Sequence, residues 1–182
     1  PEVSLQLAGL ASRIGAFRDA IERGLSVVDR TNLAPKVRAA AASVAGESYA
    51  GLGETTKAVE YLNRAVELDP EIDEFYISLA RVHENVDDER AASTVLRKGL
   101  TRIPESGDLR LALGLNLIAL GDFGSAIEVL EELTQRFPDR LETYRPLADA
   151  YTSSGSSEAS TETLRRLHRR QPDYPMIQVL LA

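Results

Sequence analysis

The sequence predicts an all-α fold made of repeated helical hairpins, and three observations support this prediction. Prolines recur at intervals of 34 residues, at Pro70, Pro104, Pro138 and Pro172. Glycines keep the same register, each 17 residues ahead of a proline, at Gly53, Gly121 and Gly155. Between these prolines and glycines, the apolar residues recur at the spacing of an α-helix. Because one hairpin cannot enclose its own apolar surface whereas stacked hairpins can, the folding unit is expected to be a repeat array.

Each 34-residue unit is predicted to contain two helices joined by a turn. In the second unit the first helix carries apolar residues such as Val44 and Tyr49 and ends at Gly53, since the left-handed conformation costs glycine nothing. The second helix runs to Leu68, and Pro70 follows at a point where a helix cannot comfortably continue. Small residues in the second helices predict that the paired helix axes approach closely; they are Ala58, Ala92 and Ala126.

In chain order, the predicted single array over 1–182 contains five repeats and a terminal piece. The repeats cover approximately residues 1–38, 39–72, 73–106, 107–140 and 141–174, with a partial or capping helix at 175–182. The first repeat is degenerate, and about four extra residues near 31–36 are expected to lengthen its link to the second. The terminal piece is rich in apolar residues and offers a route for self-association.

These residues resemble the tetratricopeptide repeat. The motif positions in residues 39–72 are Ala45-Gly46, Tyr49, Leu52-Gly53-Glu54, Ala58 and Pro70, and those in residues 107–140 are Leu113-Gly114, Leu120-Gly121-Asp122, Ala126 and Pro138. The resemblance implies a right-handed α-solenoid of antiparallel helix pairs. It also implies a superhelix whose concave side is lined by the first helices and binds another protein or peptide.

Three residues depart from the family pattern. Asp87 replaces the turn glycine of the third repeat, and an aspartate tolerates the left-handed conformation. Arg110 occupies a position that is usually bulky and apolar. Pro146 falls early in the first helix of the fifth repeat; a proline is tolerable within the opening turn and would kink the helix if it lay deeper. None of the three changes the predicted fold.

Composition excludes several classes of protein and site. The chain of 182 residues contains no cysteine, which rules out disulfides and thiolate chemistry, and its two histidines are too few for a histidine-built zinc site. A net charge of −7 argues against nucleic-acid binding, and no apolar run is long enough for membrane insertion. The sequence does not fix a compartment. A soluble, cytoplasmic protein is favoured, and the start at Pro1 leaves room for an upstream targeting segment.

No catalytic constellation is visible in the sequence. Asp122-Phe123-Gly124 matches a kinase triplet but falls at the predicted turn between two helices, without the accompanying kinase motifs. His83 lacks the second histidine of a zinc-protease helix and is predicted to pack between helices. The basic residues around His168 lie near a predicted helix C-terminus, where positive charge complements the helix dipole. We therefore predict that the chain is not an enzyme and binds no metal or cofactor.

The resemblance places the candidate partner-binding residues on the first helices. These candidates are Arg81, Glu84, Leu111, Leu115, Ile118, Arg145 and Asp149, and the wider lining includes Ser43, Glu47 and Ile77. In the fourth repeat, the stripe of Leu111, Leu115 and Ile118 is surplus to what packing between repeats requires. Neighbouring helices could cover this stripe, or it could form an exposed patch, with the charged residues as its rim, that anchors a partner. Both readings remain open on the sequence.

Two functions follow as expectations. The first is a protein–protein interaction scaffold that binds a partner peptide or helix in its concave groove. The second is a regulatory or docking segment of a larger enzyme or of a secretion or assembly complex, since the chain ends within a repeat. The fold by itself does not choose between them, because the same scaffold serves unrelated roles.

Overall fold

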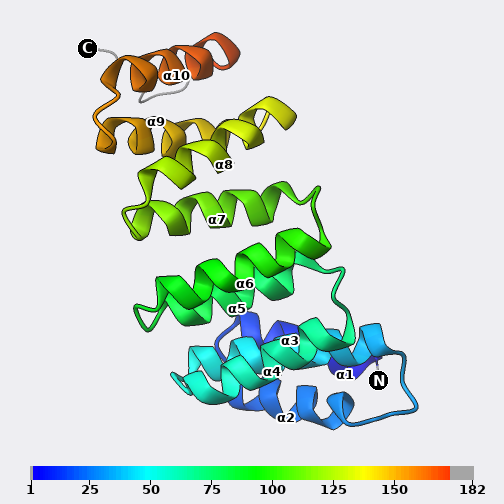
Figure 1. Ribbon diagram of the computed structural model, residues 1–182. Helices are drawn as coiled ribbons and strands as arrows, with labels where there is room; N and C mark the ends of the chain where they lie inside the picture. Colours follow the sequence, from blue (N-terminus) through cyan, green and yellow to red (C-terminus); the bar gives the residue numbers. More distant parts are fainter. Residues whose placement is uncertain (1, 173–182) are drawn as a thin grey trace. The chain divides into compact units, whose positions relative to one another are not determined.

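The computed structural model describes residues 2–172 and shows the predicted succession of helix pairs (Figure 1). In this part of the chain there are ten α-helices, one short 3-10 helix and no strand. The helices are α1 (Glu2–Arg13), α2 (Phe17–Val28), α3 (Pro35–Gly51), α4 (Thr55–Leu68), α5 (Asp73–Glu84), α6 (Glu89–Arg102), α7 (Gly107–Ala119), α8 (Phe123–Arg136), η1 (Leu141–Thr143), α9 (Tyr144–Ser153) and α10 (Ser157–Arg170). The all-α prediction is therefore confirmed, while the predicted capping helix at 175–182 lies outside the described residues.

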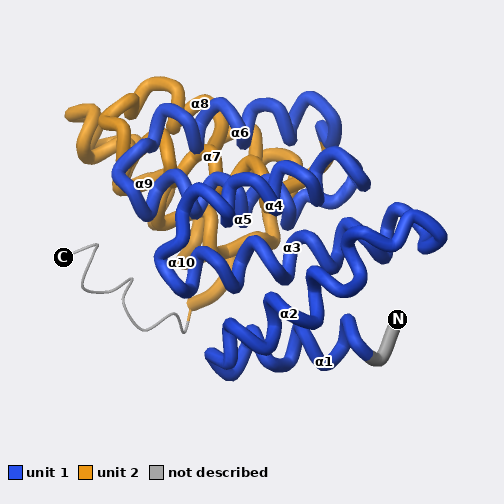
Figure 2. Tube along the Cα trace, turned by 90° about the horizontal axis from the view of Figure 1, so that it is seen from below, with its two compact units in different colours: residues 1–104 blue, residues 105–182 orange. Residues whose placement is uncertain are grey.

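The chain divides into two compact units, residues 1–104 and residues 105–182 (Figure 2). Unit 1 contains the hairpins α1/α2, α3/α4 and α5/α6, and within it α2 packs on α3 and α4 packs on α5. Unit 2 contains the hairpins α7/α8 and α9/α10, and within it α8 packs on α9. The pairs α1/α2, α5/α6, α7/α8 and α9/α10 each lie inside one of the predicted repeat ranges, whereas α3 begins at Pro35, before the second range of 39–72. The single continuous array over 1–182 stays a prediction.

The turn between the two helices of a repeat has one left-handed residue. The glycines at this position have φ angles of 79° at Gly15, 76° at Gly53, 75° at Gly121 and 83° at Gly155. Asp87 holds the equivalent position with φ 57°, which confirms that it adopts the conformation of the turn glycine. Left-handed backbone costs free energy for a residue with a Cβ atom but not for glycine, and aspartate is one of the residues that tolerate this cost.

The structure shows how two of the three departures from the family pattern are accommodated. Pro146 is the third residue of α9, so it lies in the opening turn, where a proline is tolerated. Arg110 is buried, and its Nη2 lies 3.2 Å from Glu132 Oε1 on α8. The equivalent positions hold Tyr76 and Tyr144, whose hydroxyls donate to the carbonyl oxygens of residues 70 and 138. The arginine therefore replaces a buried tyrosine by pairing its charge with a carboxylate.

Small residues bring paired helices close together, as predicted. Ala58, Ala92 and Ala126 are fully buried. A Cβ atom added at Gly114 would lie 2.5 Å from Leu130 Cδ2, and one added at Gly46 would lie 3.1 Å from the carbonyl oxygen of Ala58. The absence of a side chain at these two positions sets the separation of α7 from α8 and of α3 from α4.

Ion pairs recur with the same 34-residue period. An arginine in the last turn of a second helix contacts the acidic residue that follows the previous repeat's closing proline. The pairs are Arg102–Glu71 at 3.2 Å, Arg136–Glu105 at 2.7 Å and Arg170–Asp139 at 3.0 Å. Because all three carboxylates are largely exposed, each pair contributes little to stability.

The link between the first two repeats is longer than the link at 69–72, as expected. It covers 29–34, and the remaining extra residues lengthen α3, which begins with Pro35 in its first turn. No helix within residues 2–172 combines the length and the apolar character that crossing a membrane requires.

Candidate partner-binding surface

In unit 1, two consecutive first helices line an open hollow of about 150 Å³. Its lining comes from α3 and α5 and consists of Glu47, Ala50, Ser78, Arg81, Val82 and Asn85. Glu47 and Arg81 are 34 residues apart, so they hold the same position in successive repeats. The hollow is large enough to hold water or one side chain of a partner.

The charges of this hollow are not equivalent. Ser78 and Ser43 donate hydrogen bonds to Glu47 Oε1, at 2.8 Å and 3.3 Å, so the carboxylate is held in place from both helices. Arg81 is exposed, and its guanidinium has no ion-pair partner in residues 2–172. Glu84, one turn further along α5, is half-buried and does not line the hollow. Arg81 is therefore the candidate in unit 1 whose charge remains open to a partner.

In unit 2, part of the apolar stripe on α7 is covered by neighbouring helices and part of it is exposed. Leu111 and Ile118 are half-buried and pack against the core cluster of α8 and α9, which consists of Leu130, Leu133 and Leu147. Leu115 is 47% exposed. Neighbouring helices thus cover the two outer residues of the stripe and leave its central leucine open.

The charged candidates of unit 2 lie on α9. Arg145 Nε is 4.0 Å from Asp149 Oδ2, and the two side chains are 55% and 64% exposed. A solvent-exposed pair at this distance is weak, so both side chains are available to other partners at little cost.

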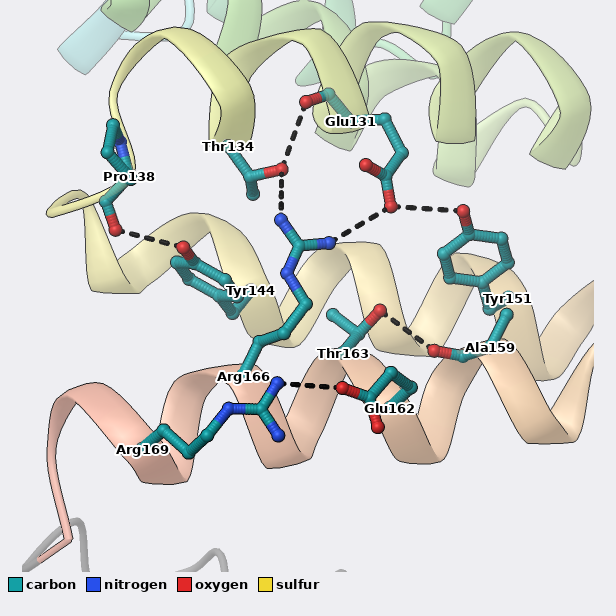
Figure 3. Close-up of polar contacts among 10 residues, drawn as sticks. All are labelled: Glu131, Thr134, Pro138, Tyr144, Tyr151, Ala159, Glu162, Thr163, Arg166 and Arg169. Carbon is teal, nitrogen blue, oxygen red and sulfur yellow. Dashed lines mark hydrogen bonds and ion pairs between the residues drawn. The ribbon is translucent and has the colours of Figure 1, made fainter.

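A polar network between α8, α9 and α10 was not visible in the sequence (Figure 3). Arg166 donates to Glu131 Oε1 at 3.3 Å and to Thr134 Oγ1 at 3.2 Å, and the Tyr151 hydroxyl donates to the same Glu131 oxygen at 3.1 Å. Burial is the main cause that raises the pKa of Tyr151, and the hydrogen bond and charge of Glu131 raise it further. Arg166 and Glu131 are 35 residues apart, as are the paired residues Arg64 and Asp29. This recurring separation of an arginine and an acidic residue is the sequence feature that could have indicated the network.

Comparison with known proteins shows what the repeats are similar to. Two family models described as tetratricopeptide repeat match residues 117–182 and residues 40–72. Lipopolysaccharide assembly protein B of Escherichia coli strain K12 is 29% identical over 124 residues, which are 65% of this chain and 32% of that protein. The same protein of Escherichia coli O157:H7 matches to the same extent. The chain thus spans about a third of the length of the curated relatives it matches.

Solved structures share the arrangement of helices. The crystal structure of MamA protein superposes with a TM-score of 0.74 at 21% identity, covering 96% of this chain and 94% of MamA. YrrB, described as a tetratricopeptide repeat (TPR) protein with an unusual peptide-binding site, superposes with a TM-score of 0.71 at 18% identity, covering 97% of this chain and 89% of YrrB. At these identities the likeness establishes the fold.

Proposed function

Since this chain belongs to the tetratricopeptide repeat family, we propose that it is a protein–protein interaction scaffold whose first helices bind a segment of a partner protein. The proposal assigns the chain no catalytic activity of its own. The observation that carries it is the hollow between α3 and α5, which combines an exposed cation with a fixed carboxylate.

In unit 1 the proposed contact is polar. Arg81 supplies a guanidinium that has no charge partner within residues 2–172, and Asn85 adds an amide at the same hollow. Glu84 stands on the same helix as a further charged candidate. A partner side chain that enters the hollow displaces water and meets the Glu47 carboxylate in a fixed position, so little side-chain ordering is needed there.

In unit 2 the proposed contact is apolar at its centre. Leu115 is the anchor, with Leu111 and Ile118 on either side of it along α7, and Arg145 and Asp149 on α9 supply polar contacts. An apolar centre with polar surroundings is the usual composition of a protein interface. YrrB, which shares this fold and is described as having a peptide-binding site, lends further support.

The experiment that tests the apolar contact of unit 2 uses Leu115→Asp. The intact chain, this variant and Val86→Asp are immobilised, and the proteins that each retains from an extract of the source cells are quantified by mass spectrometry. Val86 is the matched control because it is 48% exposed and lies at the turn after α5. We expect Leu115→Asp to lose the specific partner while Val86→Asp keeps it, with equal helical content in all three. Equal retention by all three proteins would refute the role of Leu115.

A second candidate function is a docking segment of a longer protein that works in an assembly complex. The match to lipopolysaccharide assembly protein B favours it, since that protein is about three times as long as the matching segment. Sequencing the intact reading frame tests this candidate. Further domains joined to the repeats would support it, whereas a frame that contains only these residues would count against it.

A further inference from the structure

The solvent-exposed face of α6 carries positive charge and no negative charge. This cationic face consists of the exposed residues of the helix, which are Arg90, Thr94, Arg97, Lys98, Thr101 and Arg102. Arg102 pairs with Glu71, whereas Arg90, Arg97 and Lys98 have no ion-pair partner within residues 2–172. In a chain whose net charge is −7, three unpaired cations on one helix are a local reversal of charge.

The other second helices carry a glutamate at the centre of the equivalent face. Thr94 lies seven residues after the left-handed turn residue Asp87. The residues seven positions after the four left-handed turn glycines are Glu22, Glu60, Glu128 and Glu162. All five positions are exposed, so the stacking of repeats leaves this face open in every described hairpin. Among the five second helices that the structure describes, α6 is thus the one without an acidic residue at the centre of its face.

The stability of α6 does not explain all of its cations. Lys98 lies near the C-terminus of the helix, where positive charge complements the helix dipole. Arg90 is the second residue of the helix and lies at the positive end of the same dipole, which disfavours a cation. The hydroxyl of Thr94 donates to the carbonyl oxygen of Arg90 at 2.9 Å, so its hydrogen bond is made within the helix. The charge of Arg90 is therefore available to a ligand and contributes nothing to its own helix.

The three unpaired cations lie close enough to act on one ligand. Arg90 and Lys98 are eight residues apart, which corresponds to about 12 Å along an α-helix. This separation is similar to the Debye length of about 10 Å at 0.1 M salt, so the fields of the cations overlap. The face exposes no large apolar side chain that could insert between lipids, and the net charge of the chain disfavours nucleic acid. An acidic segment of another protein is the anionic ligand that fits.

We propose that the cationic face of α6 binds an acidic segment, rich in aspartate and glutamate, of a partner protein. With Thr94 in place of the repeated glutamate, the carboxylates of that segment meet no like charge at the centre of the face. This surface lies on a second helix and shares no residue with the hollow between α3 and α5, so it is additional to the contacts of the first helices. One exposed ion pair contributes up to about fivefold in affinity, so the complex is weak and sensitive to salt.

Fluorescence anisotropy of a labelled peptide of ten glutamates tests the proposal with the intact chain at about 0.05 M salt, where exposed charges are weakly screened. The unchanged chain should bind this peptide and should not bind a peptide of ten glutamines. Replacing Arg90, Arg97 and Lys98 together with glutamate should weaken binding by at least about tenfold. The matched control makes the same change at three other exposed cations without an ion-pair partner in residues 2–172, which are Arg13, Arg18 and Arg30. Equal losses in the two triple variants would mean that net charge alone acts, and would overturn the proposal.

Thr94→Glu tests the centre of the face with a single substitution. It introduces the residue that the other second helices carry at this exposed position, so the fold should be kept. Thr94→Glu should weaken peptide binding about fivefold, whereas Thr94→Gln, which is similar in size and uncharged, should bind like the unchanged chain. Equal affinities of these two variants, or no binding by the unchanged chain, would overturn the proposal. A chain that binds vesicles of phosphatidylserine and phosphatidylcholine but not the glutamate peptide would overturn it as well. Circular dichroism should show the same helicity in every variant, since all substituted residues are exposed.

Discussion

Replacing Arg166 with methionine removes the cation that ties α10 to α8 and α9. Its guanidinium contacts Glu131 and Thr134 and lies 5.4 Å from the ring centroid of Tyr144 (Figure 3). Methionine keeps an unbranched apolar stem of similar length, so the packing of the stem is preserved. The substitution therefore isolates the polar contacts of the arginine.

The loss expected from Arg166→Met can be worked from these contacts. The side chains of Arg166 and Glu131 are 29% and 25% exposed, so the ion pair is only partly screened and contributes about 1 kcal/mol. The hydrogen bond to Thr134 contributes about 1 kcal/mol, and the contact with the Tyr144 ring about 0.5 to 1 kcal/mol. The rotamer freedom that the side chain regains offsets up to about 1 kcal/mol. The net loss of stability is about 2 kcal/mol, or about 4–8 °C in Tm for a chain of this size.

Thermal unfolding followed by circular dichroism measures this loss, with Arg169→Met as the matched control. Arg169 pairs with Glu162 at 2.7 Å, but the two side chains are 61% and 50% exposed, so its replacement should leave Tm unchanged within error. If both variants lowered Tm by the same amount, burial would not decide the strength of these pairs, and the reasoning would be wrong. A fall of less than 1 °C for Arg166→Met would refute it as well.

Two other predictions concern the turns and the tyrosines. Asp87→Gly should raise the free energy of unfolding by about 0.5–1 kcal/mol. It removes a left-handed backbone cost of about 1–2 kcal/mol, and the greater conformational entropy that glycine gives the unfolded chain cancels part of this gain. Urea unfolding measures the change, and Gly121→Asp should have the opposite effect. Burial is the main cause that raises the pKa of Tyr61, Tyr76 and Tyr151. Their neutral phenols therefore contribute stability that is fully present below about pH 10, the pKa of an unfolded tyrosine, and is lost as pH rises through the folded pKa values. Ultraviolet titration should show late-ionising phenols, and six tyrosines that all ionise at their ordinary pKa would contradict this prediction.

The fold was predictable because the same local sequence features recur in every repeat. Helical periodicity, a left-handed turn residue and a closing proline recur in register, so an irregular copy can be interpreted from its neighbours. Asp87 was correctly placed in the turn for this reason. These features depend on backbone conformation over a few residues, which the sequence encodes directly.

The candidate surface was less predictable because exposure depends on contacts between helices. Leu111, Leu115 and Ile118 share one stripe in the sequence, yet Leu115 is exposed while Leu111 and Ile118 are half-buried. Leu7 and Leu10 on α1 are exposed, whereas the residues at the same positions of later repeats, such as Leu79 and Val82, are buried. Whether such a residue meets solvent is decided by which helix packs on it.

The sequence by itself determined the helix pairs, the turn residues and the family of this protein, because a 34-residue period leaves one consistent placement for each helix. Only the tertiary structure decided that Arg110 is buried against Glu132, that Ser78 and Ser43 hold Glu47 at the hollow of unit 1, and that Leu115 is the exposed residue of the α7 stripe. The physical reason is that helix formation follows from local backbone and side-chain preferences. The burial and pairing of a side chain follow from its neighbours in space.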